Sequence, residues 1–252
     1  MVIIYKNEGE TPLEALDRLR VEQPEYKDAV LSYAGRLDPM AEGQLLVLVG
    51  EENKEREKYL GLDKEYEVEI LFGVSTDTGD ILGLLEGHLQ ATMSGLEARQ
   101  CQTLLQSFVG KFTQKYPHYS SKTVNGKPLF QWAREGRLDE IEVPTRDAEI
   151  YSIELLKTFE ISGEEIFRKI TERIGKVKGD FRQKEILDSW REGLEGKGRL
   201  KEAPTGHLRP IMQIRVNCSS GTYMRSLAEA IGRKMGTTSI AWSIKRTLLK
   251  SF

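Results

Sequence analysis

The sequence predicts an α+β fold built around one long, mixed but mostly antiparallel sheet, in a chain of 252 residues. Segments with the alternating pattern of half-buried strands outnumber the helical patterns and separate them irregularly, whereas a parallel α/β fold would alternate the two regularly. No Gly-, Ser- or Pro-rich linker and no internal repeat divides the chain. We therefore expect a single domain over residues 1–252.

The first elements are a helix and strands that flank a loop. Thr11-Pro12-Leu13-Glu14 has the pattern of a capping box with proline at the first helical position, and it predicts a helix to about Arg20. Residues 29–33 and 44–49 are apolar runs of strand length. Residues 64–73 alternate between apolar side chains and glutamates, which predicts a half-buried strand.

The remaining elements follow the same two patterns. Alternation predicts long strands over residues 146–160, 211–219 and 238–249. Capping residues, helical periodicity and terminal glycines predict helices over residues 94–108, 127–136, 164–177, 181–196 and 222–235. Two of these helices lie in an insertion at about residues 160–204, which precedes the strand at residue 211.

Composition makes several classes of protein improbable. No run of about 18 apolar residues and no signal-like segment at the start is present, so we expect a cytoplasmic protein that does not enter a membrane. Cys101 and Cys218 lack the spacing of a metal site or a disulfide framework. The three histidines are also dispersed, so we expect no metal.

Charge is segregated along the chain, although the formal net charge is only -2. Residues 98–134 contain no Asp or Glu, where the chain's average would give about six, and their basic residues alternate with aromatic ones. Residues 203–252 contain one acidic residue, Glu229. Two basic surfaces of this kind suit a phosphate backbone, and the aromatic residues suit unstacked RNA bases. A solvated basic face without function gives the same pattern.

The most informative stretch is Ala34-Gly35-Arg36-Leu37-Asp38-Pro39-Met40-Ala41-Glu42-Gly43. It places Asp38 in a loop, punctuated by glycine and proline, between two predicted strands. A carboxylate fixed in this way is a candidate catalytic group. An Asp-Pro turn with a purely structural role fits the same residues.

Five segments, in order along almost the whole chain, resemble the TruB family of pseudouridine synthases. The first is the Asp38 loop, and the others extend the match beyond residue 240. They are Gly35-Arg36-Leu37-Asp38-Pro39 with Gly43, Lys64-Glu65-Tyr66 with Phe72-Gly73-Val74-Ser75-Thr76-Asp77-Thr78-Gly79-Asp80 and Gly83, the stretch 117–134, Cys218-Ser219-Ser220-Gly221-Thr222-Tyr223-Met224-Arg225, and Arg246-Thr247 with Phe252.

The resemblance implies an isomerase that converts uridine to pseudouridine on the pseudouridine synthase fold, with the active-site loop in a central cleft. Asp38 is then the catalytic carboxylate, acting either as a nucleophile on the ribose or as a base at the sugar. Arg225 would pair with Asp38 and keep it ionised, and Tyr66 would stack on the uracil and help to remove the C5 proton. The reaction has no net redox change, so no cofactor is expected.

The resemblance also implies a tRNA substrate, with the T-loop uridine at position 55 as the target, which the enzyme must extrude from the folded RNA. Another RNA, or a non-catalytic RNA-binding or RNA-folding role on the same fold, is the alternative. The residues that the resemblance and the charge pattern assign to substrate or RNA binding are Lys6, Tyr33, Arg36, Tyr119, Lys122, Lys127, Arg134 and Tyr223.

The chain departs from the family pattern at several positions. Tyr33 stands where the family usually has histidine, Arg36 replaces a small residue, and Tyr5-Lys6-Asn7 retains only the lysine of the usual D-K-P. No C-terminal PUA domain follows Phe252, so we expect a catalytic domain alone, as a monomer. The insertion at 160–204 is either a helical hairpin packed on the sheet or an addition to the RNA-contacting surface.

Overall fold

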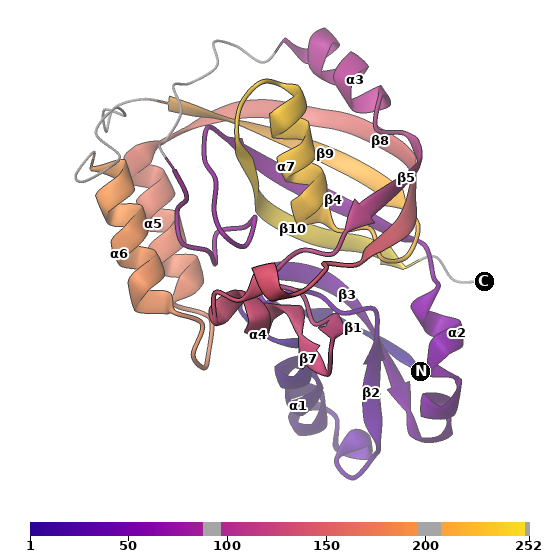
Figure 1. The fold of residues 1–252 in the computed structure, drawn as a ribbon. Coiled ribbons are helices and arrows are strands. Elements are labelled where there is room, and N and C mark those ends of the chain that lie inside the picture. Colours follow the sequence, from indigo (N-terminus) through magenta and orange to yellow (C-terminus); the bar gives the residue numbers. More distant parts are fainter. Residues whose placement is uncertain (88–96, 196–207, 250–252) are drawn as a thin grey trace.

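The computed structural model describes residues 1–87, 97–195 and 208–249, and it confirms the predicted α+β class. Eight strands form one sheet in the order β1-β3-β10-β4-β9-β8-β5, with β2 paired to β3 (Figure 1). The strands are β1 (Val2–Lys6), β2 (Leu31–Ala34), β3 (Ala41–Val49), β4 (Lys64–Phe72), β5 (Gly110–Lys115), β8 (Thr145–Ser162), β9 (Leu208–Cys218) and β10 (Ser239–Leu249), and a separate pair is formed by β6 (Thr123–Val124) and β7 (Lys127–Pro128).

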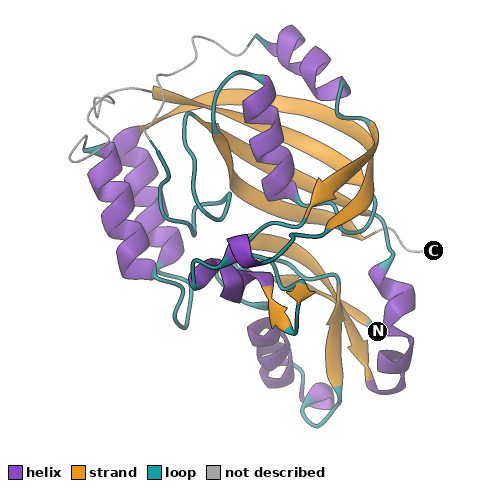
Figure 2. Cartoon of the chain, in the orientation of Figure 1, coloured by secondary structure: helices purple, strands orange, loops and turns teal. Residues whose placement is uncertain are grey.

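Helices cover the sheet in separate groups (Figure 2). They are α1 (Pro12–Glu22), α2 (Arg56–Leu60), α3 (Ala98–Gln106), α4 (Leu129–Arg134), α5 (Gly163–Ile174), α6 (Gln183–Leu194) and α7 (Met224–Lys234), with 3-10 turns at Pro24–Tyr26, Gly50–Glu55 and Leu138–Glu140. None of the described helices is long and apolar enough to cross a membrane. The predicted helix start at residues 94–96, part of the insertion and Phe252 lie outside the described residues.

A parallel pairing of two strands joins the part of the sheet formed by β1, β2 and β3 to the rest. Among the described strands, all pairs are antiparallel except β3 and β10, which pair in parallel and bring Gly43 opposite Arg246. Gly43 has φ of 113°, and a Cβ atom there would lie 2.2 Å from the backbone oxygen of Arg246. Only glycine fits at this position, so the C-terminal end of the Asp38 loop is fixed against β10.

The insertion is part of the core. On α5, Ile166, Ile170 and Ile174 recur every four residues on one face and are fully buried, as are Ile186 and Trp190 on α6. They share a cluster with apolar residues of β8, β9 and β10. Each fully buried side chain of this kind contributes roughly 1.5–3 kcal/mol. The helical hairpin packed on the sheet, one of the two interpretations of the sequence, is thus what the structure contains.

One local prediction was wrong, and another holds only in part. Residues 127 and 128 do not begin a helix, because Asn125 and Gly126 both have positive φ and turn the chain into the short hairpin of β6 and β7 before α4 starts. The basic stretch expected over residues 203–252 is divided between core and surface within the described residues, because Arg209, Arg225 and Arg246 are buried whereas Arg233, Lys234 and Lys245 are exposed.

Candidate active site

A cavity of about 860 Å³ opens beside the Asp38 loop. Its walls come from this loop, β4, the turn at residues 78–82, the segment at 119–121, the turn before α6 and the segment at 220–225. Seven of the residues predicted from the sequence line it: Asp38, Tyr66, Arg225, Arg36, Tyr119, Arg134 and Tyr223. Segments that lie far apart in the sequence thus meet at one place.

The centre of the cavity is an ion pair between Asp38 and Arg225. Arg225 Nε donates to Asp38 Oδ2 at 2.8 Å, through a single nitrogen rather than a two-point fork. The side chain of Arg225 is 4% exposed and that of Asp38 is 31% exposed. The arginine is therefore fixed inside the protein, while the carboxylate remains accessible to a substrate.

The other nitrogens of Arg225 hold two neighbouring segments. Nη1 donates to the carbonyl oxygen of Thr78 at 2.6 Å, and Nη2 donates to that of Tyr119 at 3.1 Å. Burial acts to lower the pKa of the guanidinium, but the carboxylates of Asp38 and Asp80 outweigh burial and raise it. Arg225 is therefore a permanent cation that connects three parts of the site.

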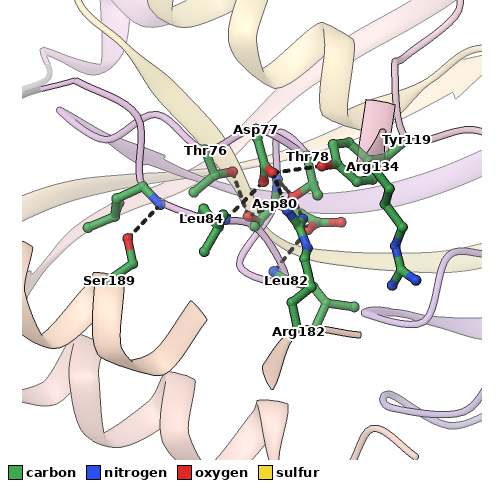
Figure 3. Close-up of polar contacts among 12 residues, drawn as sticks. Thr76, Asp77, Thr78, Asp80, Leu82, Leu84, Tyr119, Arg134, Arg182 and Ser189 are labelled. Atoms are coloured by element: carbon green, nitrogen blue, oxygen red, sulfur yellow. Dashed lines mark hydrogen bonds and ion pairs between the residues drawn. The ribbon is translucent and has the colours of Figure 1, made fainter. Parts of the chain in front are cut away.

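Asp80 is a second carboxylate beside Arg225 that was not predicted as a site residue, although it stands in the Thr76-Asp77-Thr78-Gly79-Asp80 motif. Its Oδ2 lies 3.8 Å from Arg225 Nε, and its Oδ1 accepts hydrogen bonds from the Thr78 hydroxyl and the Leu82 amide (Figure 3). Burial, with a smaller contribution from Asp38, raises the pKa of Asp80. Asp80 is buried and Asp38 is partly exposed, so the two carboxylates have different environments.

Tyr66 lies on the central strand β4, facing the cavity, and is only 7% exposed. Burial is the main cause that raises its pKa. The side chain is therefore a neutral phenol at neutral pH, which suits stacking on a base and hydrogen bonding.

Three buried cations lie behind the Asp38 loop. Arg246 donates from Nε to the Gln44 carbonyl at 2.6 Å and from Nη2 to the Gly35 carbonyl at 3.0 Å. Burial lowers the pKa of Lys64 and of Lys6 to about 8. Arg246 and Lys64 line the cavity but were not predicted as site residues, although both belong to the motifs that carried the resemblance.

Lys6 and Tyr33 were predicted to bind RNA, and neither is among the described residues that line the cavity. Lys6 is fully buried, and its ammonium donates to the carbonyl oxygens of Asn7, Pro39 and Ala41, so it holds the loop and cannot touch RNA. Tyr33 packs beside the cluster of α1 and β3 and is not among the described residues that line the cavity. Burial thus rules out RNA contact for Lys6, whereas Tyr33 is only partly buried and its contact with RNA stays a prediction.

The basic residues predicted to grip RNA have different surroundings. Lys122 is exposed and lies 5.3 Å from the ring of Tyr116, and Arg134 is exposed at the rim of the cavity. Lys127 is paired with Glu135 at 2.6 Å and lies over the ring of Trp132. Their contacts with RNA remain predictions, and Lys127 already has a structural partner.

Tyr223 also lines the cavity, at the N-terminus of α7. Its ring meets that of Tyr116 edge to face at 5.8 Å. Burial, with the negative charge of Asp38, raises its pKa to about 12. Like Tyr66, it offers an aromatic face and an uncharged hydroxyl.

Groups of histidine, cysteine and carboxylate side chains that could hold a metal ion do not occur within residues 1–87, 97–195 and 208–249. His88 and His207 lie outside these ranges. The residues that line the cavity supply carboxylate, phenol and cationic groups for acid–base, nucleophilic and stacking chemistry.

The family and the curated relatives that this chain resembles are all described as pseudouridine or pseudouridylate synthases. Residues 26–176 match the family described as TruB family pseudouridylate synthase (N terminal domain). The tRNA pseudouridine synthase B of Bordetella avium (strain 197N) is 30% identical over 224 residues, which cover 89% of this chain and 71% of that protein. The tRNA pseudouridine synthase 4 of Saccharomyces cerevisiae is 31% identical over 81% of this chain and 57% of that protein. Most of the curated relatives compared are considerably longer, and the chain spans 54% of several of them.

Solved structures share the fold at low identity. A chain of a Cbf5-Nop10-Gar1 complex superposes with a TM-score of 0.56 at 17% identity, covering 98% of this chain and 48% of that chain. A chain of an H/ACA RNP bound to a substrate RNA that contains 2′-deoxyuridine superposes with a TM-score of 0.51 at 16% identity, covering 98% of this chain and 47% of that chain. The predicted fold is therefore confirmed.

Proposed function

We propose that this chain, which belongs to the TruB family of pseudouridylate synthases, is an RNA-modifying isomerase that converts uridine to pseudouridine in tRNA. The observation that carries the proposal is the pair formed by Asp38 and Arg225. These residues are 187 positions apart, yet the fold joins them at 2.8 Å in a cavity beside Tyr66. A fixed cation, an accessible carboxylate and a buried aromatic ring are the groups that the reaction needs.

The reaction breaks the bond between N1 and C1′ of the uridine, rotates the freed uracil and joins C5 to C1′. The proton lost from C5 is balanced by the proton gained at N1, so no oxidant or reductant is consumed. Asp38 acts as nucleophile at the ribose or as base at the sugar. Within the described part of the chain its hydrogen bond from Arg225 falls on Oδ2, which leaves the second oxygen for the substrate.

Two neighbours support this assignment. Arg225, itself buried, holds the Asp38 carboxylate in place through a charge-assisted hydrogen bond. Tyr66 stacks on the extruded uracil, because its neutral ring lies in the cavity wall. We propose that Tyr66 also helps to remove the C5 proton, because the charge of Arg246 acts against the rise in the pKa of Tyr66 that burial causes.

The target that the family resemblance favours is the T-loop uridine at position 55. The names of the relatives in Bordetella and Saccharomyces refer to tRNA, which supports the substrate class. We further propose that the protein acts in the cytoplasm and as a monomer. Arg36 and Arg134 at the cavity rim would meet the phosphates on either side of the extruded nucleotide.

The test is incubation with unmodified tRNA transcripts, followed by mapping of pseudouridine at single-nucleotide resolution. We expect one modified site in the T-loop, and none when position 55 of the transcript is cytidine. Modification at another position would replace the proposed target, and RNA binding without any pseudouridine would favour the non-catalytic RNA-binding alternative.

Asp38→Asn is the matched variant, and we expect it to abolish the reaction while RNA affinity stays within a few fold. The change removes the reactive carboxylate but no phosphate contact, so the rate should fall by roughly 10⁴-fold or more. Single-turnover rates and filter binding measure the two quantities. Turnover that persists in the variant would overturn the assignment of Asp38.

A further inference from the structure

The turn that precedes α6 brings the insertion into the cavity wall. Asp180, Phe181 and Arg182 line the cavity, although the helices on either side pack into the core. Arg182 Nη1 lies 2.7 Å from Asp77 Oδ2, and its guanidinium carbon lies 4.9 Å from the centre of the Tyr119 ring. Figure 3 shows the Arg182 side chain reaching from the insertion toward these two residues.

Asp77 joins these contacts into one network. The same Oδ2 accepts a hydrogen bond from the Tyr119 hydroxyl at 2.9 Å, and Oδ1 accepts one from the Leu84 amide at 2.9 Å. The backbone oxygen of Tyr119 in turn accepts from Arg225, which holds Asp38. Two residues, Asp77 and Tyr119, therefore connect Arg182 to the pair of Asp38 and Arg225, and each step of this path is a hydrogen bond or an ion pair.

Further contacts fasten the insertion to the same parts of the site. Arg134, at the end of α4, donates to the backbone oxygen of Asp180 at 2.9 Å. On α6, the Ser189 hydroxyl accepts from the Leu85 amide and Trp190 donates to the Gly83 carbonyl. The insertion is thus attached both to the turn after β4 and to residues 116–134, the RNA-gripping segment, which carries most of the residues predicted to bind RNA.

The backbone of Arg182 is unusual. It has φ of 62° and ψ of 30°, a left-handed conformation that residues with side chains rarely adopt, and its side chain does not cap α6. Such a conformation persists where surrounding contacts hold it. Here the contacts are those of the guanidinium with Asp77 and Tyr119.

We propose that Arg182 is a positioning residue that holds Tyr119 and the segment at residues 116–134 over the Asp38 and Arg225 pair, so that the insertion latches the RNA-gripping segment to the core. Its effect on catalysis rests on the proposed function, but the latch itself does not. Arg182 acts through Tyr119 and Asp77 and does not need to touch the reacting atoms.

The structural test is amide hydrogen exchange of the free protein, measured by mass spectrometry. In Arg182→Ala we expect exchange across residues 116–134 to accelerate roughly fivefold or more, while peptides of α5 and β9 keep the rate of the parent protein. Arg182→Gly should give the same result, because glycine accepts the left-handed backbone and the variant still lacks the guanidinium.

The matched control is Lys184→Ala, near the start of α6, where the side chain is 87% exposed and pairs only on the helix surface. It should leave exchange of residues 116–134 unchanged. Equal exchange of this segment in the parent and in both Arg182 variants would overturn the latch. Acceleration throughout the protein in both variants would also overturn it, because the role would then be general stability.

The catalytic readout separates this inference from the proposed function. If the parent forms pseudouridine, Arg182→Ala should raise the tRNA concentration for half-maximal rate by roughly fivefold, with a smaller change in the maximal rate. The slope of the logarithm of RNA affinity against the logarithm of salt concentration should not change. A slope that is smaller by roughly one unit would identify Arg182 as a phosphate contact and overturn the latch. If the parent forms no pseudouridine, the proposed function fails and hydrogen exchange still decides the latch.

Discussion

Each nitrogen of the Arg225 guanidinium contacts a different segment: the Asp38 loop, the turn at Thr78 and the backbone of Tyr119. One side chain therefore sets the position of the reactive carboxylate and of two walls of the cavity. This arrangement depends on the planar shape of the group as much as on its charge, because a lysine ammonium cannot reach three acceptors in one plane.

We therefore expect Arg225→Lys to lower the single-turnover rate by about 10²-fold, through misplacement of Asp38 and Tyr119 rather than loss of charge. Melting by circular dichroism should stay cooperative, because a cation still faces Asp80. Arg233→Lys, on the exposed side of the same helix, is the matched control and should retain the rate of the parent protein. A parental rate in Arg225→Lys would show that charge alone suffices.

The buried ammonium of Lys64 should make the free energy of unfolding depend on pH. Burial lowers its pKa from 10.5 to about 8. Between these pH values the unfolded chain binds a proton that the folded protein has released, so a rise in pH through this window stabilises the fold. Below about pH 8 both states carry the proton, and this increment is absent.

Lys64→Met removes the titrating group. The stability of the parent relative to this variant should rise by on the order of 3 kcal/mol between pH 8 and pH 10.5. Urea unfolding of both proteins at the two pH values measures the difference, with Lys54→Met as the control at an exposed site. If the difference in stability between the parent and Lys64→Met is the same at both pH values, the pKa of Lys64 is not lowered by burial.

At the scale of elements, the strands and helices with strong periodicity were predictable, and those set by distant partners were not. The sequence located β4, β8 and α7 to within a few residues, because alternation or capping signals marked them. It did not indicate β1 or β5, which form edges of the sheet and depend on pairing with β3 and β8. Likewise, nothing in the helical pattern of the insertion indicated that Arg182 reaches the cavity.

The segment from β5 to α4 remains the predicted RNA-gripping element, but its basic residues are not equivalent. Lys122 and Arg134 are exposed, whereas Lys127 is paired with Glu135. We expect Lys122→Gln and Arg134→Gln each to flatten the salt dependence of RNA binding by roughly 0.7–0.9 units of slope for each phosphate that the variant no longer neutralises, and Lys127→Gln to have a smaller effect.

Titration of tRNA binding against salt concentration measures these slopes, after circular dichroism has shown an intact fold. Lys169→Gln, on the insertion helix α5, is the control, because it removes a charge away from the cavity. Parental slopes in the Lys122 and Arg134 variants would place the RNA on another surface.

At the scale of the whole molecule, the cavity lies where two parts of the sheet meet. The Asp38 loop joins β2 to β3, whereas Tyr66 lies on β4 and β9 leads into α7, the helix that carries Arg225 (Figure 1). The two parts are joined by the parallel pairing of β3 with β10 and by Arg246, which donates to Gly35 and Gln44 across the junction. Local pattern cannot predict this junction, because it depends on residues about 200 positions apart.

Gly43 tests the junction most directly. A methyl group at this position would overlap the backbone of Arg246, which cannot move without breaking the pairing of β3 with β10, and φ of 113° would strain any other residue. Gly43→Ala should therefore lower the free energy of unfolding by on the order of 3 kcal/mol and reduce pseudouridine formation, because the Asp38 loop loses its anchor. Gly61→Ala, where a Cβ atom meets nothing within 4 Å, is the matched control for stability and should change the free energy of unfolding little. Urea unfolding and single-turnover assays measure the two effects. If Gly43→Ala unfolds like Gly61→Ala and retains the parental rate, the junction is not what holds Asp38 beside Arg225.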